Sequence, residues 1–181
     1  MTPSSRIIDS PIGPLKLTVE HDALIGIDWA APNEPILNEH APKAGALDRV
    51  ESELSRYFSG KLEHWSLELS LKGTEFQQSV WAALRNIPEG TTRTYQDIAD
   101  AIGKPSAVRA VGSAIGRNPI PVVIPCHRVI GSNGSLTGFS GGLDKKTWLL
   151  RHEGILPANT NQKDLRAMRP SRESDRPSSV R

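Results

Sequence analysis

Polar and apolar residues alternate in three short segments at the start of the chain, residues 6–9, 15–20 and 24–29. Alternation with a period of two is typical of strands that bury one face. A stretch with Pro and Gly at 10–14 and the pair His21-Asp22 separate the segments, as turns do. The pattern therefore predicts a small antiparallel meander.

The apolar spacing changes after a Pro- and Asn-rich connection at 31–42. Positions with helical spacing are Leu47, Val50, Leu54, Tyr57 and Phe58. They predict a helix that stops at Gly60. Residues 65–71 alternate again and predict one more strand. We expect residues 1–72 to form a small α/β domain, an antiparallel sheet covered by one helix.

The pattern from residue 73 onward is mostly helical. Thr74 and Gln77 form a capping box before an apolar face at 76–87, which Pro88 ends. A second box, Thr94-Tyr95-Gln96-Asp97, opens a short helix through residue 102. After a break at 103–105, Ser106 is the expected cap of a helix that runs to about residue 116. We expect residues 73–156 to form a winged helix-turn-helix-like domain.

The second helix of this pair, residues 107–115, consists mainly of small residues, and its one long polar side chain is Arg109. Small residues allow a helix to approach a partner backbone closely, which suits DNA binding. They also allow close packing inside a domain, and the pattern alone does not separate these two interpretations.

Composition and charge exclude several classes of protein. The chain of 181 residues has a net charge of +2 and no apolar run near the ~20 residues of a membrane span. Its start does not resemble a signal peptide, so we expect a cytoplasmic protein. Residues 157–181 hold six Lys or Arg and three Asp or Glu with few apolar residues, which predicts a disordered tail. Any nucleic-acid binding must therefore come from a local patch.

The chain has one cysteine, Cys126, followed by His127 and Arg128. A lone thiol is either a small core residue or a reactive group, and only the thiolate is nucleophilic. Residues 101–143 contain no Asp or Glu but include Lys104 and Arg109, together with Arg117 and Arg128. We expect a positive field around the thiol, which favours the reactive interpretation.

Six motifs in the C-terminal part carry a family resemblance. They are Thr94-Tyr95-Gln96, Arg109-Ala110-Val111-Gly112, Arg117-Asn118-Pro119, Pro125-Cys126-His127-Arg128-Val129, Gly138-Phe139-Ser140-Gly141-Gly142 and Leu149-Leu150-Arg151-His152-Glu153-Gly154. In this order and spacing the chain resembles the O6-alkylguanine-DNA alkyltransferases, also called methylated-DNA–protein-cysteine methyltransferases. The N-terminal part is similar to the family's small α/β domain in outline only.

The resemblance implies a cofactor-free reaction in which a thiolate takes the alkyl group of O6-alkylguanine once and keeps it. Cys126 matches the nucleophile, His127 the base that accepts the thiol proton through a water, and Glu153 the residue that orients the base. Asn118 matches the residue that braces the active-site loop, and it also suits a helix C-cap. Without the resemblance, His127 suits a structural histidine and Glu153 a solvated charge at a helix end.

The resemblance also implies a base pocket. Tyr95 matches the tyrosine that protonates the leaving guanine at N3, although a tyrosine at this point of a helix is otherwise half-buried packing. Backbone groups of Cys126, Val129 and Ser140 are expected to recognise the base. The expected substrate-binding residues are Tyr95, Val129, Phe139, Ser140 and Gly141. Many relatives have tyrosine at position 139, so Phe139 keeps the apolar wall and loses a hydroxyl.

Double-stranded DNA containing O6-alkylguanine is the implied partner. The helix with Arg109 is expected in the minor groove, with Arg109 filling the gap left by the flipped nucleotide. The expected DNA-binding residues are Thr94, Arg109, Ala110, Gly112, Ser113 and Arg128. We expect no membrane partner and a monomer, and leave cooperative binding along DNA open.

Three classes of function remain after the sequence. They are a single-turnover repair transferase, an alkyltransferase-like protein that binds lesions without chemistry, and a cysteine hydrolase. The second class lacks the cysteine that this chain has, and the third needs an oxyanion site and repeated turnover. Because the N-terminal domain has no cysteine, the thiolate-rich zinc site of some relatives cannot form, and no metal is expected.

Overall fold

The computed structural model describes residues 3–31 and 45–157. Its N-terminal part is a three-stranded antiparallel sheet in the order β1 (Ser4–Ile8), β2 (Leu15–Glu20) and β3 (Ala23–Trp29). His21 and Asp22 connect β2 to β3 with φ values of 50° and 62°, the left-handed backbone of a tight two-residue hairpin turn. The three predicted strands are therefore present within two residues of their expected bounds.

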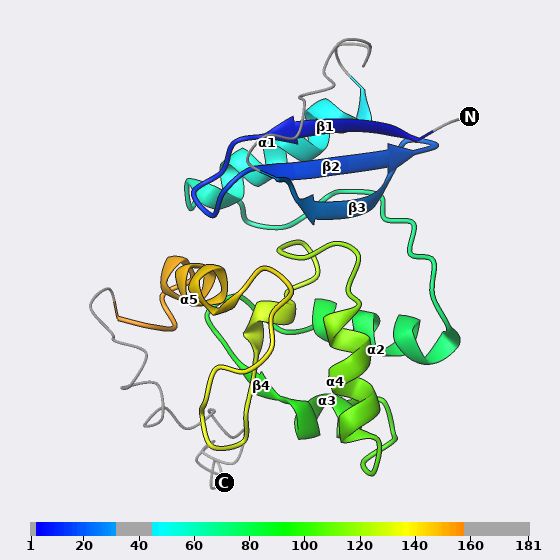
Figure 1. Cartoon of the computed structure of the whole chain (residues 1–181), viewed down its shortest axis with the longest axis vertical. Coiled ribbons are helices and arrows are strands. Elements are labelled where there is room, and N and C mark those ends of the chain that lie inside the picture. The colour runs from blue at the N-terminus through cyan, green and yellow to red at the C-terminus, as the bar shows by residue number, and fades with distance from the viewer. Residues whose placement is uncertain (1–2, 32–44, 158–181) are drawn as a thin grey trace, which may run out of the picture.

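Helix α1 (Ala46–Phe58) covers one face of this sheet (Figure 1). The inward residues of β2, Leu15, Leu17 and Val19, are buried, and the residues between them are not. Leu47 and Leu54 on α1 are buried against them in the same core. The alternation along β2 and the helical spacing along α1 thus describe the two sides of one contact.

The prediction of a strand at 65–71 is wrong. Leu24 in β3 bridges to Leu69, and the neighbouring backbone bonds are Leu24 N–H to Glu68 O at 2.8 Å and Ser70 N–H to Leu24 O at 3.0 Å. Further along β3, the Ile27 N–H donates to Pro119 O of the C-terminal part at 2.9 Å. The edge of β3 is therefore shared between two segments, and neither pairs long enough to form a strand.

The C-terminal part contains α2 (Glu75–Arg85), α3 (Tyr95–Ala101) and α4 (Val108–Gly116). Both expected capping boxes are present, with Thr74 bonded to Gln77 and Thr94 to Asp97. The expected Ser106 cap is wrong, because the N-cap of α4 is Ala107, which makes no side-chain cap bond. The Ala107 N–H instead donates to Lys104 O at 2.9 Å, so the turn between α3 and α4 ends one residue later.

Two short elements surround the cysteine. Cys126–Arg128 form a 3-10 helix, and β4 (Arg93–Thr94) pairs in parallel with β5 (Val129–Ile130) directly after it. A last helix, α5 (Leu143–His152), ends just before Glu153, where the sequence suggested a helix end without giving the bounds of the helix. Its buried face includes Lys146 beside Leu149 and Leu150, and this lysine interrupts the apolar pattern that identifies a helix.

The main buried core crosses both parts of the chain, from the sheet and α1 to α2, α4 and α5, and Leu150 and Leu156 form a second, small cluster. In Figure 1 the sheet lies above the helices of the C-terminal part, and α5 lies beside the loops that carry the cysteine. Among the described residues, no helix is both long and apolar enough to cross a membrane. The predicted disordered tail lies outside the described residues, except for Pro157.

Candidate functional site

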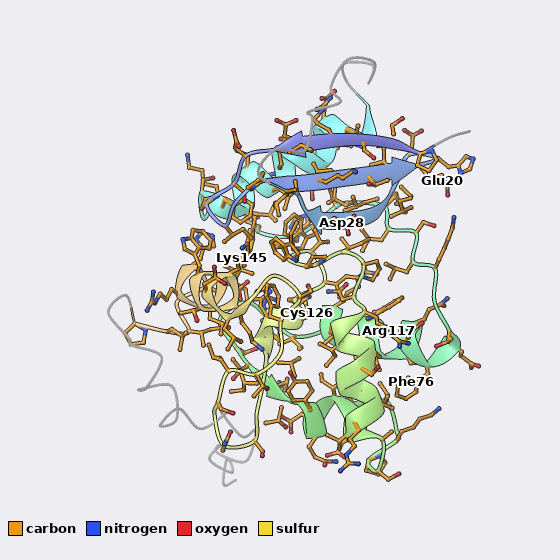
Figure 2. All side chains as sticks on the ribbon, viewed as in Figure 1. Glu20, Asp28, Phe76, Arg117, Cys126 and Lys145 are labelled. Carbon is orange, nitrogen blue, oxygen red and sulfur yellow. The ribbon has the colours of Figure 1, made fainter. Side chains whose placement is uncertain are left out.

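Cys126 begins the 3-10 helix and is 4% exposed. Asn118, just after α4, braces the loop that leads to Cys126. Its Nδ2 donates to Ile124 O at 2.8 Å, and its Oδ1 accepts from the Ile120 N–H at 3.0 Å. Val122 in this loop has a φ of 75°, a strained conformation for a β-branched residue. In the view of Figure 2 Cys126 lies between α5 and α4. The loop is thus held in one shape behind the thiol.

The expected positive field around Cys126 is present, but burial outweighs it. Burial raises the pKa of the Cys126 thiol, while a hydrogen bond from Asn118 and the charge of Lys146 act to lower it. None of the cations suggested by the sequence is the source of this charge. The resting group is therefore a protonated thiol, and it needs a base to become a nucleophile.

His127 is fully buried, and its Nε2 lies 2.8 Å from Oε1 of Glu153 at the C-cap of α5. An ionised carboxylate only accepts hydrogen bonds, so the proton on the neutral ring is on Nε2 and the lone pair is on Nδ1. Nδ1 makes no hydrogen bond with any described residue. Burial lowers the pKa of His127, so the ring is neutral and Nδ1 can take a proton. We call Cys126, His127 and Glu153 the relay.

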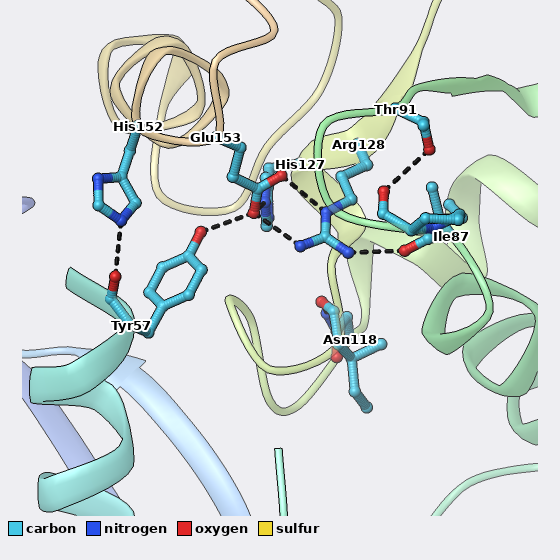
Figure 3. A network of polar contacts seen from close by, with 10 residues as sticks. Tyr57, Ile87, Thr91, Asn118, His127, Arg128, His152 and Glu153 are labelled. Carbon is cyan, nitrogen blue, oxygen red and sulfur yellow. Dashed lines mark hydrogen bonds and ion pairs between the residues drawn. The ribbon is translucent and has the colours of Figure 1, made fainter. Parts of the chain in front are cut away.

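Arg128 binds the same carboxylate from another side (Figure 3). Its Nε donates to Glu153 Oε2 and its Nη2 to Oε1, both at 2.8 Å, and its Nη1 donates to Ile87 O at 2.6 Å. Arg128 is 7% exposed. The charged end of Arg128 is thus committed to a buried ion pair in this structure, and its contact with DNA stays a prediction.

Tyr57 adds a third donor to Glu153. Its hydroxyl lies 2.7 Å from Oε1 and comes from α1, in the N-terminal part of the chain (Figure 3). Burial alone would raise the pKa of Glu153, but hydrogen bonds from His127 and Arg128 and the charge of Arg128 lower it to about 2. Glu153 is therefore a fixed negative charge at neutral pH and not the solvated helix-end charge that it resembles in the sequence.

Lys146 on α5 joins the two segments that flank the thiol. Its Nζ donates to Val129 O at 2.6 Å, to Thr137 O at 2.8 Å and to Gly138 O at 3.4 Å. Burial lowers the pKa of Lys146 to about 8. The ammonium group thus ties the chain after the 3-10 helix to the loop at 137–141.

Tyr95 and the loop at 137–141 lie together. The Tyr95 hydroxyl donates to Thr137 O at 3.2 Å. A Cβ on Gly138 would lie 3.5 Å from the hydroxyl oxygen of Tyr95. Trp29 of β3 supports the far end of the loop: its ring lies 5.7 Å from that of Phe139, and its Nε1 donates to Ser140 Oγ at 3.4 Å. The structure thus gathers the expected substrate-binding side chains around one loop.

Val129 differs from the other expected substrate-binding residues, because it is fully buried and its backbone is already engaged. Its N–H donates to Cys126 O, and its carbonyl accepts from Lys146 Nζ. Val129 is thus part of the frame of the site, and its contact with a bound base stays a prediction.

The exposed residues of α4 and its C-cap are Arg109, Ala110, Ser113, Gly116 and Arg117, which we call the α4 face. Gly112 points the other way, because a Cβ there would lie 3.7 Å from the Tyr95 ring. Thr94 is 7% exposed and its hydroxyl caps α3. Arg109, Ala110 and Ser113 are accessible, whereas Thr94 is buried, and the contact of each with DNA stays a prediction.

Comparison with known proteins agrees with this geometry. Residues 75–155 match the DNA binding domain of 6-O-methylguanine DNA methyltransferase, and residues 5–71 match its ribonuclease-like domain. A methylated-DNA–protein-cysteine methyltransferase of Mycobacterium bovis is 48% identical over 149 residues, 82% of this chain and 90% of the relative. The chain belongs to the O6-methylguanine DNA methyltransferase family.

Other members of the family extend the likeness. A Methanosarcina barkeri methylated-DNA–protein-cysteine methyltransferase is 49% identical over 154 residues, 81% of this chain and 94% of the relative. The crystal structure of a Mycobacterium tuberculosis O6-methylguanine methyltransferase has a TM-score of 0.75 at 46% identity and covers 87% of this chain and 97% of its own. The structure of that organism's OGT in complex with DNA has a TM-score of 0.74 at 48% identity and covers 83% of this chain and 92% of its own.

Sequence reasoning did not foresee the polar contacts of three side chains in this member of the O6-methylguanine DNA methyltransferase family. They are the bonds of Tyr57 and Arg128 to Glu153 and those of Lys146 to the loop at 137–141. A lysine among buried positions of a helix was the available signal for Lys146. Nothing local identifies Tyr57, which lies 96 residues before Glu153.

Within residues 3–31 and 45–157, no group of three or more His, Cys, Asp or Glu could hold a metal ion.

Proposed function

We propose that this chain repairs O6-alkylguanine in double-stranded DNA by transferring the alkyl group to Sγ of Cys126, once per molecule and without a cofactor. One observation carries the proposal: a buried thiol is followed by a neutral imidazole whose Nε2–H is held by Glu153, which leaves Nδ1 to accept a proton. This is the arrangement of nucleophile, base and orienting residue that activates a weak nucleophile. Family membership supports the same chemistry.

The atoms of this step balance. The thiol proton passes to His127 Nδ1, through the bridging water that the resemblance implies, and the thiolate attacks the alkyl carbon in line with its bond to O6. An S–C bond forms as the C–O6 bond breaks, and the electron pair of that bond stays on the guanine. Tyr95 supplies a proton to N3 of the leaving base, in support of which its hydroxyl lies at the loop that carries Phe139 and Ser140.

Single turnover follows from the product. An alkyl thioether is uncharged and its S–C bond has no easy route to hydrolysis, and within the described residues no second cysteine could remove the group. The extra proton on His127 passes through solvent to the Tyr95 phenolate, so both residues return to their resting forms and only the thiol is lost. Cys126 is therefore consumed, and the protein reacts stoichiometrically.

DNA binding is assigned to the α4 face. Arg109 is its exposed cation near the start of the helix, and Ala110 and Ser113 leave room for close approach to a groove. We infer that α4 enters the minor groove and that Arg109 fills the gap left by the extruded nucleotide, since the buried thiol cannot reach a stacked base. Phosphate contacts then supply affinity, which falls as salt rises.

Titration with a duplex that contains O6-methylguanine tests the proposal, with the intact mass of the protein as the readout. We expect one methyl per protein, located on Cys126, and no further repair after one equivalent. Cys126→Ala should bind the duplex within a few-fold of the wild type and carry no methyl. Repeated turnover would indicate a hydrolase, and binding without transfer by the wild type would indicate a lesion-binding protein.

Three further expectations remain proposals. We place the boundary between the two domains at residues 72 and 73, in the connection between the segment that bridges β3 and the start of α2. We propose a monomer, on the ground that one thiol and one relay complete the site within one chain. We also propose a cytoplasmic location, where a reducing environment keeps a lone thiol free.

A further inference from the structure

Glu153 carries more hydrogen bonds than its role toward His127 requires. Its Oε1 accepts from His127 Nε2 at 2.8 Å, from Arg128 Nη2 at 2.8 Å and from the Tyr57 hydroxyl at 2.7 Å. The first two donors come from the 3-10 helix beside the thiol. Tyr57 comes from the other part of the chain, at the end of α1. One oxygen of the relay is therefore bound from both parts of the protein.

The Tyr57 hydroxyl acts as a permanent donor. Tyr57 is 3% exposed, and burial together with the nearby charge of Glu153 raises its pKa, so the hydroxyl stays protonated across the working range of pH. Its partner is an ionised carboxylate, which only accepts. The direction of this hydrogen bond is therefore fixed, and it withdraws negative charge from Oε1 at all times.

The Tyr57 ring is held independently of this bond. Phe58 and Trp65 contact the ring with centroid distances of 5.3 Å and 5.4 Å. The ring of His152 on α5 lies 5.2 Å away, and its Nε2 lies 2.7 Å from Tyr57 O. Removing only the hydroxyl should leave this packing in place, so its electrostatic role can be separated from its role in packing.

We propose that Tyr57 is a positioning residue of the alkyl-transfer reaction, which sets the basicity of His127 through the shared Oε1 of Glu153. This inference rests on the proposed function. A carboxylate that shares its charge among three donors attracts the His127 proton less than one with two donors. The third donor therefore helps to keep His127 neutral and ready to accept the thiol proton. It also makes the reactivity of Cys126 depend on the docking of α1 onto α5.

The test uses Tyr57→Phe, which keeps the ring and removes the donor. We would measure the rate of Cys126 alkylation by free O6-benzylguanine at saturating concentration, between about pH 5 and 9, where histidine titrates. We expect the rate to fall most on the acid side of neutrality, where more of the His127 ring then carries a proton and cannot accept one from the thiol. The acid limb of the profile should move to higher pH, because His127 holds its proton more tightly.

His152→Phe is the matched control. It also keeps an aromatic ring at the contact between α1 and α5 and loses one hydrogen bond, the one to Tyr57 O, without touching Glu153. We expect its rate and its pH profile to match those of the wild type. Unfolding temperatures of both variants would show how far each loosens the contact.

Several outcomes would overturn the proposal. A wild-type rate and profile in Tyr57→Phe would do so, and so would equal slowing in both variants without a shift of the acid limb, which would indicate a structural role only. If Tyr57→Phe did not fold, site-specific Tyr57→3-fluorotyrosine would serve instead, since the more acidic phenol is a stronger donor and should move the acid limb to lower pH. An unmoved limb would then contradict the proposal. Failure of the wild type itself to react would refute the proposed function instead.

Discussion

The relay and the α4 face lie in the same part of the chain and are built in opposite ways. In the relay, Cys126, His127 and Glu153 are all buried, and Glu153 is bound by three residues. On the α4 face, Arg109 and Ser113 are exposed, and α4 ends with Arg117 at its C-cap, also exposed. One region is complete without a partner, and the other is not.

This difference indicates when each region forms its stabilising contacts, on folding or on binding. A buried network has a fixed geometry before the substrate arrives, so it can act on any alkylated base that reaches the thiol. If α4 is the DNA-binding helix, as proposed, its exposed small residues gain their contacts only when DNA covers them. Changes in the relay should therefore affect every substrate, whereas changes on the α4 face should affect only duplex DNA.

The largest effect is expected when the carboxylate of the relay, Glu153, loses its charge. Glu153→Gln removes the carboxylate that orients His127 and leaves Arg128 buried without its counter-charge. We expect transfer to fall about 10²-fold or more on both duplex and free base. The free energy of unfolding should fall by about 3 to 5 kcal/mol. Single-turnover kinetics and chemical denaturation would measure the two effects.

Glu63→Gln, at an exposed carboxylate, is the control for Glu153→Gln and should change neither quantity. If Glu153→Gln slowed only the duplex reaction, the relay would not be independent of DNA, and the contrast between the two regions would fail.

The relay should also determine part of the acid sensitivity of the fold. The pKa of Glu153 is about 2 in the folded protein against an ordinary 4.5, so its contribution to stability is complete above about pH 4.5 and is lost as the pH falls towards 2. The difference corresponds to about 3 kcal/mol. Unfolding free energies measured against pH should show this loss in the wild type and lack it in Glu153→Gln. Parallel curves for the two proteins would contradict the prediction.

The α4 face should show the opposite selectivity. Arg109→Ala should slow repair of duplex DNA about tenfold and leave the reaction with free O6-benzylguanine unchanged, because only the duplex requires extrusion of the base. Arg117→Ala removes the same charge at the other end of the helix. It should lower affinity for DNA in a salt-dependent way and leave the rate at saturating duplex unchanged. Equal losses on both substrates would show that Arg109 has a structural role.

The smallest effect is expected at the boundary between the two regions, the loop at 137–141. A Cβ on Gly141 would lie 2.5 Å from the Trp29 ring, so Gly141→Ala must displace either the ring or the loop. We expect transfer to slow about three- to tenfold on both substrates, which corresponds to about 1 kcal/mol of overpacking. Adding Trp29→Ala should restore most of the rate. If the double variant were slower than Gly141→Ala alone, the ring would not be the obstacle.

The sequence was sufficient where the signal is local. Strands β1 to β3 and helix α1 follow from alternation and helical spacing, because each buries one face against the other. The capping boxes at Thr74 and Thr94 predicted the starts of α2 and α3, since both partners lie within four residues. The family motifs likewise named Cys126, His127 and Glu153 before their geometry was known.

The sequence failed where a residue's role depends on a distant partner. The ion pair of Arg128 was not foreseen, because nothing nearby in the sequence shows that Glu153 will neutralise it. Residues 65–71 alternate like a strand, but Pro119 takes part of the edge of β3 that they would need. The bounds of α5 were not predicted, because Lys146 places a cation on the buried face and interrupts the apolar spacing that identifies a helix. The sequence identifies Tyr57 only as a buried aromatic of the core, and its hydrogen bond to Glu153 follows from the fold.

The position of Glu153 along the chain also matters while the protein is being made. Translation at about 5 to 20 residues per second places Glu153 about one to five seconds after Cys126, while α1 and its Tyr57 are already present. Until α5 forms, His127 has no carboxylate to orient it, and the thiol has no buried site. We therefore expect the growing polypeptide to react with alkylated bases far more slowly than the folded protein. Full reactivity should come when the C-terminal helix closes against the N-terminal one, so that an interrupted or misfolded chain seldom spends its thiol.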